Sequence, residues 1–339
     1  MHKLLAILFC FALLASCSRP TRVVVEFPQT PTGQMLQRAY KGDDAVRRAA
    51  LIELQDLPDD DKRSLLPTLG VIVERDARMR NWPMLCLYTH WSGQLTPAEQ
   101  MTKAEFAAKL RHWLPVVLAS VSNPNPSAYD SKPQDLVFEE RMPGFYAAAL
   151  LGAFTAKELR PHLTTISDAF NAPARGEMDG ESHDTWHRHF LAGVLIMMKA
   201  DGVAGLVRGL DHPHRVIREQ SLDALSNLAT DRVGQRYVVD GPDTIPLDTV
   251  RTAKEQATIR RALRSHFPRF VQALEIETED SALRDAVTIV ESIAEPALVT
   301  PRLLTALSKI EARMADKEFY ANARVRLSKL REQQSTPSR

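Results

Sequence analysis

The stretch DHPHRVIREQSLDALSNL, residues 211–228, decides the fold of this chain. Its apolar residues recur at spacings of three to five, which places them on one face of a helix. They are Ile217, Leu222, Leu225 and Leu228. The Asp-His-Pro start predicts a turn and a helix beginning, and residues 200–210, ADGVAGLVRGL, predict a second, short helix before it. Two helices joined by a tight turn cannot bury their apolar faces alone, so this unit requires similar neighbours.

The unit recurs along the chain with a period of about 33 residues, which lies in the range of helical repeats. In each copy an apolar residue precedes a basic anchor, and small or apolar residues mostly follow three and six positions later. Arg218, Arg251 and Arg284 are equally spaced, and Arg47 and Arg80 repeat the same interval. Lys317 continues the series one interval beyond Arg284. Basic residues are common here, but equal spacings in succession indicate a repeat.

This pattern resembles the HEAT repeat, in its short bacterial HEAT-like form. The family pattern is an acidic turn, then Val-Arg, Ala and Ala-Leu, and DDAVRRAALIEL (43–54) and residues 211–228 fit it best. ERDARMRNWPMLCL (74–87) fits except at Pro83, which either breaks a helix or marks the first turn of a later one. Over residues 35–331 the resemblance implies an all-α fold, an α-solenoid of HEAT-like helical hairpins. It also implies that the arginines pair with turn acids of adjacent units and are structural. These arginines are Arg47, Arg80, Arg218, Arg251 and Arg284.

Three stretches interrupt the helical pattern, near residues 123–144, 171–182 and 229–247. Insertions in repeat arrays fall on loops, which either carry function or decorate the surface. The tail, residues 332–339, is predicted to be disordered.

The first residues predict a secreted protein. Lys3 precedes thirteen uncharged residues that end in Ala-Ser, the pattern of a signal peptide over residues 1–16. This run is too short for a good membrane span, which needs about twenty apolar residues. Residues 17–34 contain three prolines and no helical period, so they are predicted to form a flexible tether.

The tetrad Leu14-Ala15-Ser16-Cys17 resembles the lipobox of bacterial lipoproteins. The resemblance implies cleavage between Ser16 and Cys17 and a covalent lipid on Cys17, with no other cofactor. Two or three acyl chains would anchor the protein stably. Ser18, in place of Asp, resembles outer-membrane sorting, so we expect a location in the bacterial cell envelope, on the outer membrane facing the periplasm. The alternative is an ordinary signal cut nearby, with Cys17 a bystander.

Composition excludes one class of partner. Loss of the signal removes one of 43 basic residues, Lys3, and leaves 42 to balance 42 acidic residues. A neutral chain argues against nucleic-acid binding, which requires net positive charge. Apolar residues at 44% and charged residues at 25% are typical of a foldable globular protein.

The segment SHDTWHRHF contains the one cluster with the character of a metal site, His183, His187 and His189. Imidazoles four residues apart on a helix can share a transition metal, and Asp184, His212 and His214 are expected nearby. The alternative is exposed histidines at a helix start, with Trp186 buried.

The function expected from these features is binding rather than catalysis. The sequence lacks GxSxG, Walker, GxGxxG and CxxC motifs, and Cys86 lies in an apolar run that would make it inert. We therefore expect a protein that is not an enzyme, a lipid-anchored scaffold or adaptor for a protein or peptide partner. One alternative is a metal-binding or enzymatic envelope protein that uses the histidines at 183–189. Another is a structural lipoprotein that spaces the layers of the envelope.

Overall fold

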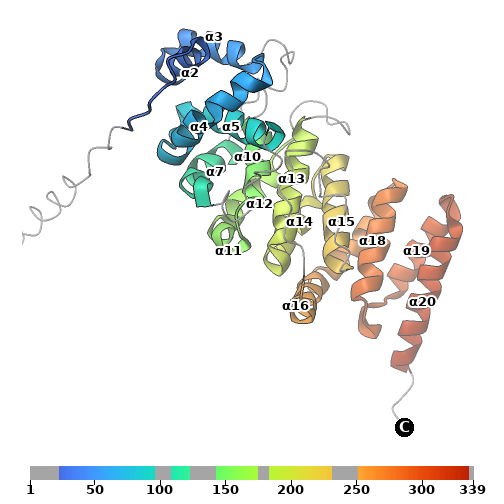
Figure 1. Ribbon diagram of the computed structural model, residues 1–339. Coiled ribbons are helices and arrows are strands. Elements are labelled where there is room, and N and C mark those ends of the chain that lie inside the picture. The colour runs from blue at the N-terminus through green and yellow to red at the C-terminus, as the bar shows by residue number, and fades with distance from the viewer. Residues whose placement is uncertain (1–22, 96–107, 123–142, 175–182, 231–250, 336–339) are drawn as a thin grey trace, which may run out of the picture. The chain divides into compact units, whose positions relative to one another are not determined.

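The computed structural model describes residues 23–95, 108–122, 143–174, 183–230 and 251–335. Every regular element in those ranges is helical, and no β-strand occurs in them (Figure 1). This confirms the predicted all-α fold class. The chain divides into an N-terminal unit, Met1–Tyr88, and a C-terminal unit, Thr89–Arg339.

The helices of the N-terminal unit follow one another with short connections. They are α2 (Pro31–Lys41), α3 (Asp44–Gln55), α4 (Asp59–Arg75), the 3-10 turn η1 (Met79–Asn81) and α5 (Trp82–Leu95), whose last turns belong to the C-terminal unit.

The C-terminal unit contains the remaining described helices. In chain order they are η3 (Arg111–Trp113), α7 (Leu114–Ser122), α10 (Pro143–Leu151), α11 (Ala156–Leu159), η5 (Arg160–His162), α12 (Leu163–Phe170), α13 (His183–Met197), η6 (Lys199–Gly202), α14 (Val203–Gly209), α15 (Arg215–Ala229), α16 (Ala253–Arg264), α17 (Phe267–Ile276), α18 (Asp280–Ile293), η8 (Pro296–Leu298), α19 (Pro301–Arg313) and α20 (Lys317–Ser335).

Helix α2 starts four residues before the boundary predicted at residue 35. The Thr30 hydroxyl caps it by accepting a backbone N–H of the first turn at 3.0 Å, and Pro31 takes the first helical position. Val25 and Phe27, inside the predicted tether, are buried. The predicted tether of residues 17–34 is therefore too long at its C-terminal end, because residues from Val25 onward belong to the folded unit.

The predicted boundaries of the C-terminal tail and of the insertions agree only in part with the helix ends. Helix α20 continues to Ser335, so the disordered tail predicted from residue 332 is wrong for its first four residues. Residues 143–144 of the first predicted insertion begin α10, and Ala229 of the third ends α15. Most of the three insertions, the signal peptide and residues 336–339 lie outside the described residues.

Pro83 occupies the second position of α5, directly after the turn η1. Proline is tolerated in a first turn because its missing N–H would have no helical partner there. The later-starting helix, one of the two predictions for this residue, is confirmed.

In the C-terminal unit each helix packs against helices close to it in chain order. The second helices of successive pairs meet, as α13 does with α15 and α15 with α18, and the first helices α17 and α19 also meet. Within a pair, α14 contacts α15 and α17 contacts α18. Figure 1 shows α13, α14, α15 and α18 following one another in this order. Neighbour-to-neighbour packing buries the faces that an isolated helix pair would leave exposed.

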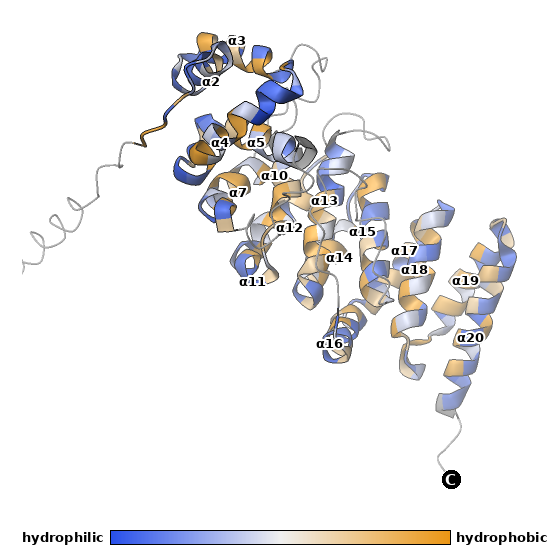
Figure 2. Ribbon diagram, viewed as in Figure 1, coloured by the Kyte–Doolittle hydropathy of each residue, from blue (hydrophilic) through white to orange (hydrophobic). Residues whose placement is uncertain are grey.

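The core comes from the apolar stripes that the sequence predicts. Ile217, Leu222, Leu225 and Leu228 of α15 have no exposed side-chain surface. Figure 2 shows apolar and polar residues sharing helices such as α15, α18 and α20. Full burial of one such side chain stabilises the fold by about 1.5–3 kcal/mol, so these four residues hold α15 against its neighbours.

The turn between α13 and α14 is tight. Lys199 has a φ of 58°, the left-handed conformation that reverses the chain after α13. Its Nζ lies 2.7 Å from Glu255 Oε1 at the start of α16. Glu255 also completes a capping box with Thr252. This ion pair connects η6 to α16.

Glu255→Gln is expected to reduce the acid sensitivity of the fold. The hydrogen bond from Lys199, followed by those from Thr252, lowers the pKa of Glu255 to about 2. Because this lies below the unfolded value of about 4.3, the carboxylate stabilises the fold fully above that value and loses its effect as the pH falls towards 2. The stability difference between the wild type and E255Q, measured by thermal unfolding, should shrink across this window. A difference that stays constant would contradict the assignment, since glutamine keeps the capping box.

Candidate functional site

The predicted lipidation and cleavage residues, Cys17 and Ser16, lie outside the described residues. Within the described ranges, no helix combines the length and the apolar character that crossing a bilayer requires.

The three predicted histidines belong to α13 (His183–Met197), and the side chains of two of them are described. His183 is the first residue of α13, and its side chain is not described. His187 is buried, whereas His189 is partly exposed, with its ring 5.7 Å from that of Trp186. The predicted burial of Trp186 is wrong, because 37% of this residue is exposed on α13. Each residue of a helix turns by about 100°, so the side chains of His187 and His189, two residues apart, lie on nearly opposite faces of α13. In the described part of the chain no group of three or more His, Cys, Asp or Glu side chains could hold a metal ion.

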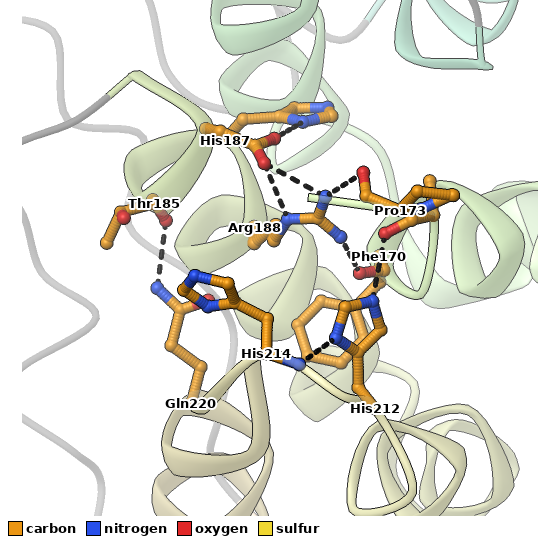
Figure 3. Close-up of polar contacts among 10 residues, drawn as sticks. Phe170, Pro173, Thr185, His187, Arg188, His212, His214 and Gln220 are labelled. Atoms are coloured by element: carbon orange, nitrogen blue, oxygen red, sulfur yellow. Dashed lines mark hydrogen bonds and ion pairs between the residues drawn. The ribbon is translucent and has the colours of Figure 1, made fainter. Parts of the chain in front are cut away.

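A buried ion pair lies beside His187 on α13. Arg188 and Asp184 of α13 each have 1% of their side chains exposed. The Asp184 carboxylate accepts from Arg188 Nη2 at 3.0 Å and from Nε at 3.2 Å (Figure 3). His187 Nδ1 lies 3.8 Å from the other carboxylate oxygen. An aspartate held this way is engaged by the guanidinium and is not presented to a solvent-facing ligand.

Arg188 also reaches the end of the preceding helix. Its Nη1 donates to the carbonyl of Phe170 at 2.5 Å, and its Nη2 to that of Pro173 at 3.0 Å. The last carbonyls of a helix have no partner inside it, so a cation there satisfies them. Arg188 therefore joins the end of α12 to α13.

His212 joins the next turn to the same helix end. Its Nδ1 accepts the backbone N–H of His214 at 3.0 Å, which leaves Nε2 to donate to the Ala172 carbonyl at 3.3 Å (Figure 3). Burial, followed by the charge of Arg188, lowers the pKa of His212. The sequence predicts His212 and His214 near the histidine segment, and the structure places His212 there in a role that holds the 211–214 turn.

The two N-terminal arginines of the repeat series bind carbonyls. Arg47 of α3 donates to the carbonyl of Arg80. Arg80 in turn donates through Nη2 to the Gly42 carbonyl at 2.8 Å. The two positions, one repeat interval apart in the chain, are thus in direct contact.

The C-terminal arginines contact the turn that precedes the next second helix. Arg218 of α15 lies 2.6 Å from Glu277, just before α18. Arg284 of α18 lies 2.7 Å from Asp316, just before α20. Both are contacts between a helix arginine and a turn acid of the adjacent unit.

Arg251, like Arg47 and Arg80, binds backbone carbonyls. It precedes Thr252, the N-cap of α16, and donates from this position to the carbonyls of Asn227 and Leu228 at the end of α15. These contacts are with a helix end. Arg251 therefore belongs to the series by its spacing, and it holds the end of α15.

A cleft between α17 and α19 was not predicted from the sequence. Its volume is about 370 Å³. The residues that line it are Leu274, Glu275, Arg302, Thr305, Ala306, Lys309, Ile310 and Arg313. On α19 these residues recur at helical spacing, so the stripe was visible in the sequence, but its facing helix was not.

The cleft combines an apolar floor with a cationic rim. Leu274, Ala306 and Ile310 are buried, whereas Lys309 and Arg313 are exposed. Arg302 binds Glu275 through two hydrogen bonds of 2.6 and 2.7 Å, which lower the pKa of that carboxyl. Such a surface suits a ligand that carries both carboxylates and aliphatic groups.

Comparison of the chain with known protein families and with curated proteins found no match. The resemblance to HEAT-like repeats and to the lipobox therefore rests on the residues of this chain.

Proposed function

We propose that this chain is a lipid-anchored protein of the bacterial cell envelope that acts as a scaffold or adaptor for another protein through the groove of an α-solenoid. The supporting sequence features are the lipobox-like tetrad ending in Cys17 and the repeat of equally spaced arginines. A lipid on Cys17 would hold the protein at the outer membrane, and the helices would face the periplasm.

The observation that carries this proposal is the way in which successive helices of the C-terminal unit pack on one another. Successive second helices pack on one another, and the contacts Arg218–Glu277 and Arg284–Asp316 repeat between them. Arrays built in this way present long surfaces suited to binding other chains. We infer binding rather than catalysis, because the most deeply buried polar groups of α13, Asp184 and Arg188, hold each other and a helix end.

Cys17→Ala is expected to release the protein from the membrane. The lipid is the proposed anchor, and its attachment requires the cysteine thiol. After cell fractionation, wild-type protein should sediment with membranes, and the variant should be in the soluble fraction or retain its signal peptide. Cys86→Ala is the matched control, because that buried thiol belongs to α5 and not to the lipobox-like tetrad. Membrane association of a cleaved Cys17→Ala variant would contradict the anchor.

A partner is expected to remain with the protein under gentle extraction. Light scattering of the detergent-extracted protein, corrected for detergent, should give a protein mass above the 38.0 kDa of the full chain and should reveal a second polypeptide. Recovery of the free monomer alone would count against the scaffold.

A further inference from the structure

The length and the apolar floor of the cleft between α17 and α19 suit a short segment of polypeptide chain. Its α19 side runs from Arg302 to Arg313, a length of about 16 Å at 1.5 Å per residue. That length matches a short stretch of chain rather than a single small anion. The buried residues of the floor, Leu274, Ala306 and Ile310, provide apolar surface along it.

The cations of the rim differ in how they are paired. Arg302 is neutralised by Glu275, and nearby Arg324 and Arg326 have Glu311 and Glu291. In the described ranges neither Lys309 nor Arg313 forms an ion pair.

The surroundings of Lys309 and Arg313 leave their charges available. Arg313 donates one hydrogen bond, from Nη2 to the Glu277 carbonyl at 2.7 Å, while the carboxylate of Glu277 is taken by Arg218. Lys309 interacts with Glu275 through the attraction of their charges, without a hydrogen bond between them. The two side chains therefore present uncompensated positive charge beside the apolar floor.

We propose, on the basis of the scaffold function above, that this cleft binds an acidic, aliphatic segment of the partner protein. Lys309 and Arg313 are one helical turn apart, about 6 Å along α19. Carboxylates two residues apart in an extended segment, or four apart in a helix, have a similar spacing. They would bind the ammonium and the guanidinium, the latter through two parallel hydrogen bonds. A neighbouring Leu, Ile or Val would cover the floor.

A membrane surface fits this cleft less well. Sites for anionic lipid heads typically gather four to eight basic residues on an exposed surface. Here the recess is lined by Lys309 and Arg313, which form no ion pair with a described residue, and by the Glu275 carboxylate. The charge pattern favours a segment with few, well-placed acids.

A displayed library of random dodecapeptides tests the proposal on the full-length chain in detergent. Peptides selected by the wild type should be enriched in acid pairs two or four residues apart beside an aliphatic residue. The best peptide, labelled for fluorescence anisotropy, should bind Lys309→Glu/Arg313→Glu at least tenfold more weakly and should lose affinity as salt increases. Lys309→Glu alone should weaken peptide binding several-fold. This single variant replaces the double variant in the test if the double variant unfolds.

Lys329→Glu/Arg331→Glu is the matched control, since it makes the same charge change on exposed residues of α20 outside the cleft. Its affinity for the peptide should equal that of the wild type. Absence of acidic enrichment, or equal peptide binding by both double variants, would overturn the proposal. So would binding to phosphatidylglycerol vesicles that depends on Lys309 and Arg313 while the peptides do not bind. If the cleft variant keeps the partner found in extracts, the cleft assignment fails and the scaffold stands.

Discussion

Arg188→Ala is expected to destabilise the C-terminal unit by about 3–5 kcal/mol, since removing one member of a buried ion pair leaves the other charge uncompensated. The variant would leave the Asp184 carboxylate buried without its guanidinium. It would also remove the hydrogen bonds to the carbonyls of Phe170 and Pro173. Chemical denaturation followed by circular dichroism measures the loss.

Arg326→Ala is the control for this prediction. Arg326 also binds a carboxylate, Glu291, through two hydrogen bonds, but 58% of its side chain is exposed. Exposed ion pairs contribute about 0–1 kcal/mol, so its removal should cost little. The double variant Asp184→Ala/Arg188→Ala should lose less than the sum of its single losses, because it leaves no unpaired charge. Equal effects of Arg188→Ala and Arg326→Ala would contradict the structural role of Arg188.

Gly202→Ala is the second substitution with a large expected effect. A Cβ at Gly202 would lie 2.0 Å from the carbonyl oxygen of Leu195 in α13 and 2.8 Å from its carbon. Backbone atoms cannot move aside without shifting the helix, and overpacking of this kind costs about 1–3 kcal/mol or more. We expect Gly202→Ala to lower the free energy of unfolding by about 3 kcal/mol or more. The loss would appear as a clear fall in the denaturation midpoint.

Gly205→Ala provides the comparison on the same turn of chain. There the nearest atom to a new Cβ is the hydroxyl oxygen of Ser167, at 2.7 Å, on a side chain that can rotate. Alanine also has a higher helix propensity than glycine, by about 1 kcal/mol, which offsets part of the cost in α14. Gly205→Ala should therefore be the milder variant. The reverse order would show that α13 and η6 do not approach as described.

Much of the helical structure could be predicted because its signals are local. The apolar stripe of α15 and the turn before it follow from spacing in residues 211–228. The start of α2 was missed although Thr30-Pro31 carries the signal of an N-cap and a first-turn proline. The three prolines and the missing helical period of residues 17–34 favoured a tether over a helix start at Thr30.

The candidate sites were harder to predict because they depend on contacts between distant segments. The histidine segment has a metal-like spacing, but the fate of Asp184 and Arg188 is decided by the carbonyls at the end of α12. The α17/α19 cleft likewise requires Glu275 and Arg302, 27 residues apart, to face each other. Periodicity within one helix reveals a stripe and does not identify the helix that covers it.

Crosslinking in intact cells with an amine-reactive reagent tests the central claim, partner binding, most directly. The tagged protein should yield a discrete adduct heavier than its own mass, and mass spectrometry should find a second, different polypeptide in it. Tagging that polypeptide should capture this chain in return. Recovery of this chain solely at its own mass, or joined only to copies of itself, would contradict the account.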